Sequence, residues 1–157
     1  MFKKGEKVIY PKHGAGKIID IFNENINKEK VKYLKIQFFN SQVTVSIPIP
    51  KAEEMGLRYP LSRNALKKAL KSLNKKQKIN KKTLITLDFI SKEKMNTGKI
   101  EDAINLVNLL KSLAKQKEEE NKNFSYSYSD RLEIAVDFIK SEVLLVLGKN
   151  TLKKYMI

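Results

Sequence analysis

The residues that could carry out catalysis or bind a metal are few, and the only histidine lies in the stretch YPKHGAG, residues 10–16. His13 has no second histidine to complete a metal site, and the chain has no cysteine to act as a nucleophile or thiolate ligand. Gly14 and Gly16 lack the third glycine of a dinucleotide-binding fingerprint, and a strand rather than a helix is expected after them. The stretch is typical of a tight turn in which Pro11 fixes φ, the glycines supply positive φ and His13 makes a local hydrogen bond. We therefore expect no catalytic residue, no metal and no cofactor.

The charge balance indicates a polyanionic partner. The 157-residue chain has 32 lysines and arginines against 17 acidic residues, a formal net charge of +15. This favours nucleic acid over acidic lipid, although the lysine bias of an AT-rich genome would give part of the same excess. No apolar stretch approaches the ~20 residues of a membrane span, and the N-terminus has no signal-peptide apolar region. We expect a cytoplasmic, nucleoid-associated protein that does not enter a membrane.

The first third of the chain has the composition of short strands. Four segments, residues 7–10, 16–22, 31–39 and 43–49, are rich in β-branched and aromatic residues. The last two roughly alternate apolar and polar residues, as half-buried antiparallel strands do. Residues 23–30 and 40–42 are interpreted as polar connections. So few strands in about 50 residues suit a small, strongly bent Tudor-like or SH3-like barrel.

From Ser62 onward the apolar residues recur at helical spacing. Leu66, Ala69, Leu70 and Leu73 follow a plausible N-cap at Ser62. Further helices are expected over residues 82–95, 99–120 and 130–147, with a short last turn after Gly148. The sequence therefore predicts an α+β protein, with a barrel domain over residues 1–58 and a compact helical domain over residues 59–157.

The stretches FKKGEKVIYPKHGAGKIIDI, YLKI and VTVSIPIPKAEEMGLR resemble the N-terminal module of the CarD/CdnL family of bacterial transcription regulators. A weaker likeness continues through NTGKIEDAINLVNLL and the last long helix. The same module occurs in transcription-repair coupling factor. That protein is a large helicase, however, and this chain lacks the P-loop of a helicase. The residues that match without a gap are Phe2, Gly5, Tyr10, Pro11, His13, Gly14, Thr44, Pro48, Ala52, Gly56, Leu57 and Arg58.

The resemblance implies a regulator of transcription initiation. Residues 1–58 would bind the β subunit of RNA polymerase, and residues 59–157 would contact double-stranded promoter DNA and stabilise the open complex. The polymerase-facing positions would be Glu24, Ile26, Thr44 and Ser46. Some family members have arginine at the positions of Glu24 and Ser46, so the polar contacts would differ here. The alternative is that Glu24 belongs to a solvated turn and Ser46 merely faces water.

The helical half carries the larger excess of positive charge. Residues 63–82 contain nine basic side chains and no acidic one, and helix geometry would put Lys67, Lys71 and Lys75 on one face, suited to phosphate contacts. The alternative is a solvated lysine-rich face. Leu84 stands where many family members have a tryptophan that packs against the minor groove, so it would be either a wedge in DNA or helix core. The full set of expected DNA-binding residues is Lys67, Lys71, Lys75, Lys81, Lys82, Leu84, Lys92 and Lys94.

Other functions remain open at this point. One is a polymerase-independent architectural protein that binds DNA or RNA, and another is an interaction adaptor with no DNA role. Tyr126 and Tyr128 could stack on bases or pack within an interhelical loop. An enzyme is the least supported class, because one histidine and no clustered ligands leave little chemistry to build on.

Overall fold

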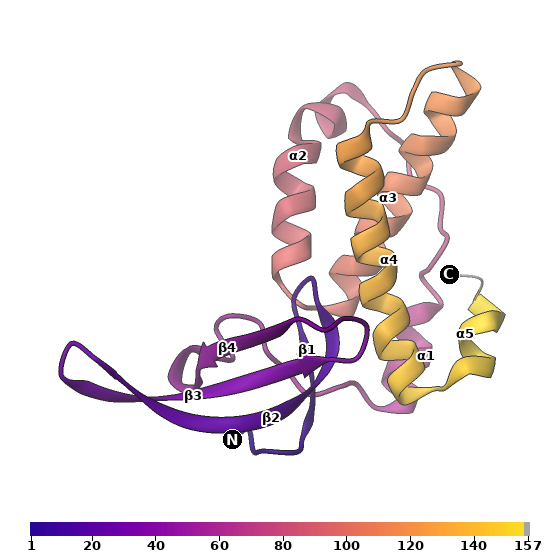
Figure 1. Cartoon of the computed structure of the whole chain (residues 1–157). Helices are drawn as coiled ribbons and strands as arrows, with labels where there is room; N and C mark the ends of the chain where they lie inside the picture. The colour runs from indigo at the N-terminus through magenta and orange to yellow at the C-terminus, as the bar shows by residue number, and fades with distance from the viewer. Residues whose placement is uncertain (156–157) are drawn as a thin grey trace.

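In the computed structural model, which describes residues 1–155, a curled antiparallel sheet is followed by a bundle of helices (Figure 1). The strands are β1 (Lys7–Tyr10), β2 (Gly14–Ile26), β3 (Glu29–Phe38) and β4 (Thr44–Pro48), hydrogen-bonded in the order β1-β2-β3-β4. Within the described residues no ladder joins β1 to β4, so the sheet is a half-barrel. The α+β class and the four predicted strands are confirmed.

The β2–β3 hairpin is longer than the sequence analysis predicted. Residues 23–30, interpreted as a polar connection, are mostly strand, because β2 runs to Ile26 and β3 begins at Glu29. The turn consists of Asn27 and Lys28 with φ of 50° and 67°, the positive-φ pair of a type I′ turn. Both faces of this ribbon are exposed near its tip, so most of its residues are polar and no alternation of apolar and polar residues is seen; Ile26 is the apolar exception. The tip extends away from the helices (Figure 1).

The helical half contains five α-helices in the described residues, after a short 3₁₀ helix, η1 (Ile49–Lys51). Ser62 caps α1 as expected, since its hydroxyl accepts a 3.2 Å hydrogen bond from the Ala65 backbone N–H. None of the described helices is long and apolar enough to cross a membrane. The helices are α1 (Arg63–Leu70), α2 (Lys81–Asn96), α3 (Ile100–Glu119), α4 (Tyr126–Val146) and α5 (Lys149–Tyr155).

Two apolar clusters form the interior, and the sheet contributes to both. One lies against the sheet and contains Val8, Leu34 and Ile47 among others. The other is centred on α3, α4 and the buried residues of α1 and α2, and it also contains Ile9 and Ala15 from β1 and β2. Alternate residues of β1 and the start of β2 thus face the helices, so the sheet packs directly on the bundle.

The joint between sheet and helices is built around Arg58. Its guanidinium donates to both carboxylate oxygens of the fully buried Glu142 on α4, at 2.8 and 2.6 Å, and to the Gly98 carbonyl at 2.7 Å. Its backbone pairs with Ile9 as an extension of the β1 edge. Residue 58 therefore lies inside a packed joint between sheet and helices. The predicted division into domains 1–58 and 59–157 stays a prediction.

The YPKHGAG stretch forms the expected turn, but it serves this joint. Pro11 packs against Gly56 and Gly98, and a Cβ on Gly14 would lie 2.2 Å from the Ser141 Oγ of α4. The predicted local hydrogen bond of His13 is absent from the described part of the chain; its ring stacks on Phe38 with centroids 4.7 Å apart. Burial against its surroundings, and secondarily the charge of Lys12, lower the His13 pKa.

Candidate functional site

The register of the sheet decides which side chains share a face. Directly paired residues of antiparallel strands point to the same side. Leu34 of β3 pairs with Ile21 and Ile47 on the side of the sheet cluster, whereas its neighbour Tyr33 pairs with Phe22 and Pro48 on the opposite side. Odd-numbered residues of β3 therefore point away from the sheet cluster.

All four predicted polymerase-binding residues lie on this second side. Each pairs with an odd-numbered residue of β3, and each is exposed. Glu24 and Ile26 reach this side because the register of β2 shifts between Ile18 and Asp20, at a β-bulge. Without the bulge, the even-numbered residues of β2 beyond it would face the sheet cluster. We give the name open face to eight exposed or half-buried residues of this side: Phe22, Glu24, Ile26, Val31, Tyr33, Lys35, Thr44 and Ser46.

An aromatic pair lies at the centre of the open face. The rings of Phe22 and Tyr33 stack with centroids 5.8 Å apart, and both are half-buried. Glu24 and Ser46 flank the pair, separated by about 13 Å along the strands and about 10 Å across them at ordinary strand spacings. The sequence analysis missed the two aromatic residues; knowledge of the cross-strand register would have been needed to find them.

The predicted DNA-binding residues do not form one surface. Lys67 and the C-cap residue Lys71 are exposed on α1, at the end of the bundle nearest the sheet (Figure 1). Lys75 is not on the same helical stripe, because α1 ends at Leu70 and the chain turns at Asn74, with φ of 66°. The hydrogen bonds of residues 71–73 run to the third residue before each, which tightens the chain beyond the helix. The predicted stripe of three lysines is therefore wrong in its third member.

The other predicted DNA-binding residues lie on α2, but they point to different sides of that helix. It begins at the end of the bundle far from the sheet (Figure 1), where the Asn80 side chain accepts from the Thr83 N–H at 2.8 Å. At 100° per residue, Lys92 and Lys94 point in nearly opposite directions. Lys94 is partly buried and pairs with Asp102 of α3 at 3.7 Å. We call the solvent side of α2 its outer side; it carries Lys81, Lys82, Ile85, Phe89 and Lys92.

Leu84 is neither a buried core residue nor the most exposed apolar residue of α2. It is 39% exposed, against 81% for Ile85 and 68% for Phe89. Ile85 and Phe89 are one helical turn apart and lie opposite the buried Leu87 and Ser91. The sequence analysis missed Phe89, although its spacing from Ile85 and its position off the buried stripe were readable.

Helix α4 fixes the edge of α2 next to Leu84. Arg131 donates to the Ser91 Oγ at 2.7 Å and pairs with Asp88 at 2.6 Å. The hydrogen bonds from Arg131 and then from Lys92 lower the Asp88 pKa, so this carboxylate stays charged at neutral pH.

Tyr126 and Tyr128, expected in a loop, belong to the first turn of α4; Tyr126 is exposed, while the Tyr128 ring packs near Phe124 and Arg131. Across residues 1–155, no group of three or more His, Cys, Asp or Glu side chains could hold a metal ion.

Comparison with known proteins finds a CarD-like domain and a relative of similar length. Residues 2–59 match the family model of the CarD-like/TRCF RID domain. The putative transcription factor YdeB of Bacillus subtilis (strain 168) is 28% identical over 148 residues, 94% of each chain. Residues 2–59 thus form a CarD-like domain, and the chain as a whole is similar to YdeB. The match to YdeB extends beyond the CarD-like domain through the helical half.

A solved CarD domain also resembles part of the chain. The solution structure of the 72-residue N-terminal domain of Myxococcus xanthus CarD matches over 38% of this chain and 79% of that one, with 20% identity and a TM-score of 0.33.

Proposed function

We propose that this CarD-like protein is a transcription regulator that binds the β subunit of RNA polymerase through the open face and promoter DNA through its helices. The observation that supports it most is that Glu24, Ile26, Thr44 and Ser46 share one exposed face within the domain that matches the family model. In this proposal the bound protein modulates the stability of the open promoter complex.

The sheet offers a physical way to hold a protein partner. β4 is an edge strand of the described sheet, so its free backbone groups can pair with an extended segment of the polymerase. Main-chain hydrogen bonds would supply affinity. Thr44 and Ser46 on that strand, with the Phe22–Tyr33 pair beside them, would supply shape and specificity.

DNA contact is proposed for the outer side of α2. Lys81, Lys82 and Lys92 can contact phosphates, which position a protein without reading sequence. Ile85 and Phe89 between them can press into the minor groove where base pairs open, and Leu84 would assist from the flank. Lys67 and Lys71 would reach DNA only at the other end of the bundle.

The function is tested by the lifetime of open promoter complexes formed by purified RNA polymerase from the same organism. The full chain should change this lifetime. Ile26→Asp should abolish the change, whereas Asn25→Asp should not, because Asn25 adjoins Ile26 on the opposite face of the same hairpin. Equal effects of the two variants would contradict a role for the open face.

The DNA part is tested in the same assay with Lys81→Gln, Lys82→Gln and Lys92→Gln combined. The matched control combines Lys3→Gln, Lys4→Gln and Lys51→Gln, which remove the same charge from exposed positions of the sheet domain. We expect the α2 variant to bind polymerase normally but to lose most of its effect on the open complex. An unchanged effect would favour the adaptor function, and duplex binding without any polymerase binding would favour the polymerase-independent function.

A further inference from the structure

We propose that a groove beside α3 is a second binding site for DNA, one that takes the phosphodiester backbone of a duplex. It runs between α3, α2 and the segment of residues 71–80 that joins α1 to α2. The proposal rests on the proposed function, which supplies DNA as the partner, and it adds a surface distinct from the outer side of α2. We call it the lysine groove; it is lined by Lys75, Lys76, Lys78, Lys94, Lys111 and Lys115.

Two side chains of α3 hold the joining segment in place. Asn108 is 3% exposed, and its amide accepts from the Asn74 N–H and donates to the Ser72 carbonyl, both at 2.7 Å. One turn further along, the Ser112 hydroxyl accepts from the Gln77 N–H at 2.9 Å. A buried amide that is satisfied at both ends fixes the backbone it contacts. Lys75 and Lys76 are therefore held beside the α3 lysines.

The positive charge of the lysine groove is not neutralised by the protein. Among the described residues, five of its six lysines form no ion pair; Lys94 alone does, with Asp102. Lys111 donates to the Asn74 side-chain oxygen at 3.0 Å, and Glu119 is the one acidic residue of the lining. Gathering like charges raises the free energy of the folded chain, and a bound polyanion lowers it again.

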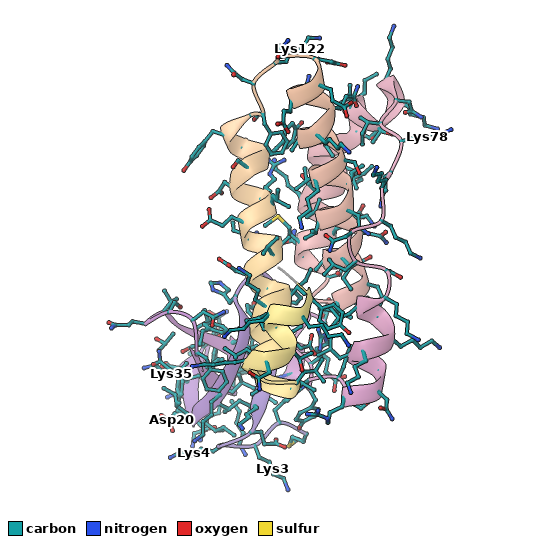
Figure 2. The ribbon with its side chains drawn as sticks, turned by 90° about the vertical axis from the view of Figure 1, so that its right-hand side faces the viewer. Lys3, Lys4, Asp20, Lys35, Lys78 and Lys122 are labelled. Carbon is teal, nitrogen blue, oxygen red and sulfur yellow. The ribbon has the colours of Figure 1, made fainter. Side chains whose placement is uncertain are left out.

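The remaining lining indicates a duplex backbone rather than unpaired bases or a nucleotide. It consists of amides, hydroxyls and aliphatic side chains, and none of the lining residues is aromatic. An unpaired base would find no ring on which to stack. Two of the three hollows that make up the groove share Lys76, Ser112 and Lys115, so they form one track along α3. The third, which contains Lys78 and Lys94, adjoins them at Gln77. Lys78 projects from the joining segment into solvent on this side (Figure 2).

The test measures binding of the full chain to a labelled 20-base-pair duplex over a range of salt concentrations. The groove variant combines Lys76→Gln, Lys111→Gln and Lys115→Gln. The control is again Lys3→Gln, Lys4→Gln and Lys51→Gln; Lys3 and Lys4 lie at the opposite end of the molecule from Lys78 (Figure 2). Three lost phosphate contacts should make the plot of log affinity against log salt less steep by about 2.7, at roughly 0.9 per contact. The corresponding Lys→Arg variant should keep the wild-type slope, and the control should change it far less.

Each other outcome overturns the proposal in a recognisable way. If the wild type binds the duplex and the groove variant behaves like the control, the groove proposal fails and the proposed function is untouched. If the wild type does not bind duplex DNA, the DNA part of the proposed function fails with it. Tripolyphosphate is titrated in parallel. Loss of its binding in the groove variant, with an unchanged duplex slope, would show that a free polyphosphate is the occupant instead.

Discussion

Glu142 is a fully buried carboxylate at the contact between sheet and helices, and its neighbours explain why it can be there. Arg58 supplies two charge-assisted hydrogen bonds, and the Leu61 N–H supplies a third at 2.9 Å. A buried charge is tolerated only when it is paired and its oxygens are satisfied. The pair thus ties together the segment that follows the sheet, the start of the segment that leads into α1, and α4.

Replacing Glu142 with glutamine should destabilise the protein strongly. The change leaves the guanidinium of Arg58, which is 22% exposed, without its counter-charge. Removing one partner of a buried pair costs about 3–5 kcal/mol, and the partial exposure of Arg58 favours the lower end. Urea unfolding would measure it. Glu133→Gln, at an exposed position of the same helix, is the control, and equal stability of the two variants would refute the account of the joint.

At the scale of elements, β2 approaches α4 so closely that Gly14 has no room for a side chain. Its φ is +78°, and an added Cβ would lie 2.2 Å from the Ser141 hydroxyl oxygen, which also accepts from the Ala15 N–H at 3.0 Å. Gly148 has a similar φ of +87° but nothing within 4 Å of an added Cβ. The two glycines therefore differ in the room available for a side chain and not in backbone conformation.

Gly14→Ala should cost more stability than Gly148→Ala. Both substitutions incur the penalty of a side chain at positive φ, about 1–2 kcal/mol. Only Gly14→Ala also forces α4 away from the sheet, which adds about 1–3 kcal/mol of overpacking. Thermal or urea unfolding of the two variants measures the difference. Similar losses would mean that the contact between β2 and α4 is looser than described.

The pattern of apolar residues predicts some of the strands and helices and misses the bounds of others. Strands and helices were found where one face is buried, because burial imposes period 2 or 3.6 on the apolar residues. The pattern fails where no face is buried, as in the tip of the β2–β3 hairpin. It also fails at the end of α1, where the Asn108 and Ser112 side chains of α3 hold the following segment outside the helix.

The candidate sites were predictable only in part, because they depend on strand register and on contacts between residues far apart in the sequence. Glu24, Ile26, Thr44 and Ser46 came from a family resemblance, and that they share a face depends on a bulge between Ile18 and Asp20 that reverses the alternation of β2. Lys94 was grouped with Lys92 although two residues along a helix means nearly opposite directions. The lysine groove combines residues about 35 positions apart, which no local pattern brings together.

At the scale of the whole molecule, sheet and helices share one interior. Ile9 and Ala15 lie in the cluster of the helices, and the Arg58–Glu142 pair crosses the same boundary. We therefore expect the open face, the outer side of α2 and the lysine groove to keep a fixed relative orientation. A protein docked on polymerase would then present its helices to DNA at one defined position. Residues 1–60 alone would expose Ile9 and Ala15, so binding is best measured with the full chain.

The most direct test of the central claim is the affinity of the full chain for purified RNA polymerase from the same organism. Wild type, Ile26→Asp and Asn25→Asp would be compared near physiological salt. An aspartate in the open face must be desolvated on docking without a partner, so Ile26→Asp should weaken binding by about tenfold or more, on the order of 1.4 kcal/mol, whereas Asn25→Asp on the opposite face should stay close to wild type. If both variants bind as tightly as the wild type, or the wild type does not bind, the open face is not the polymerase-binding surface.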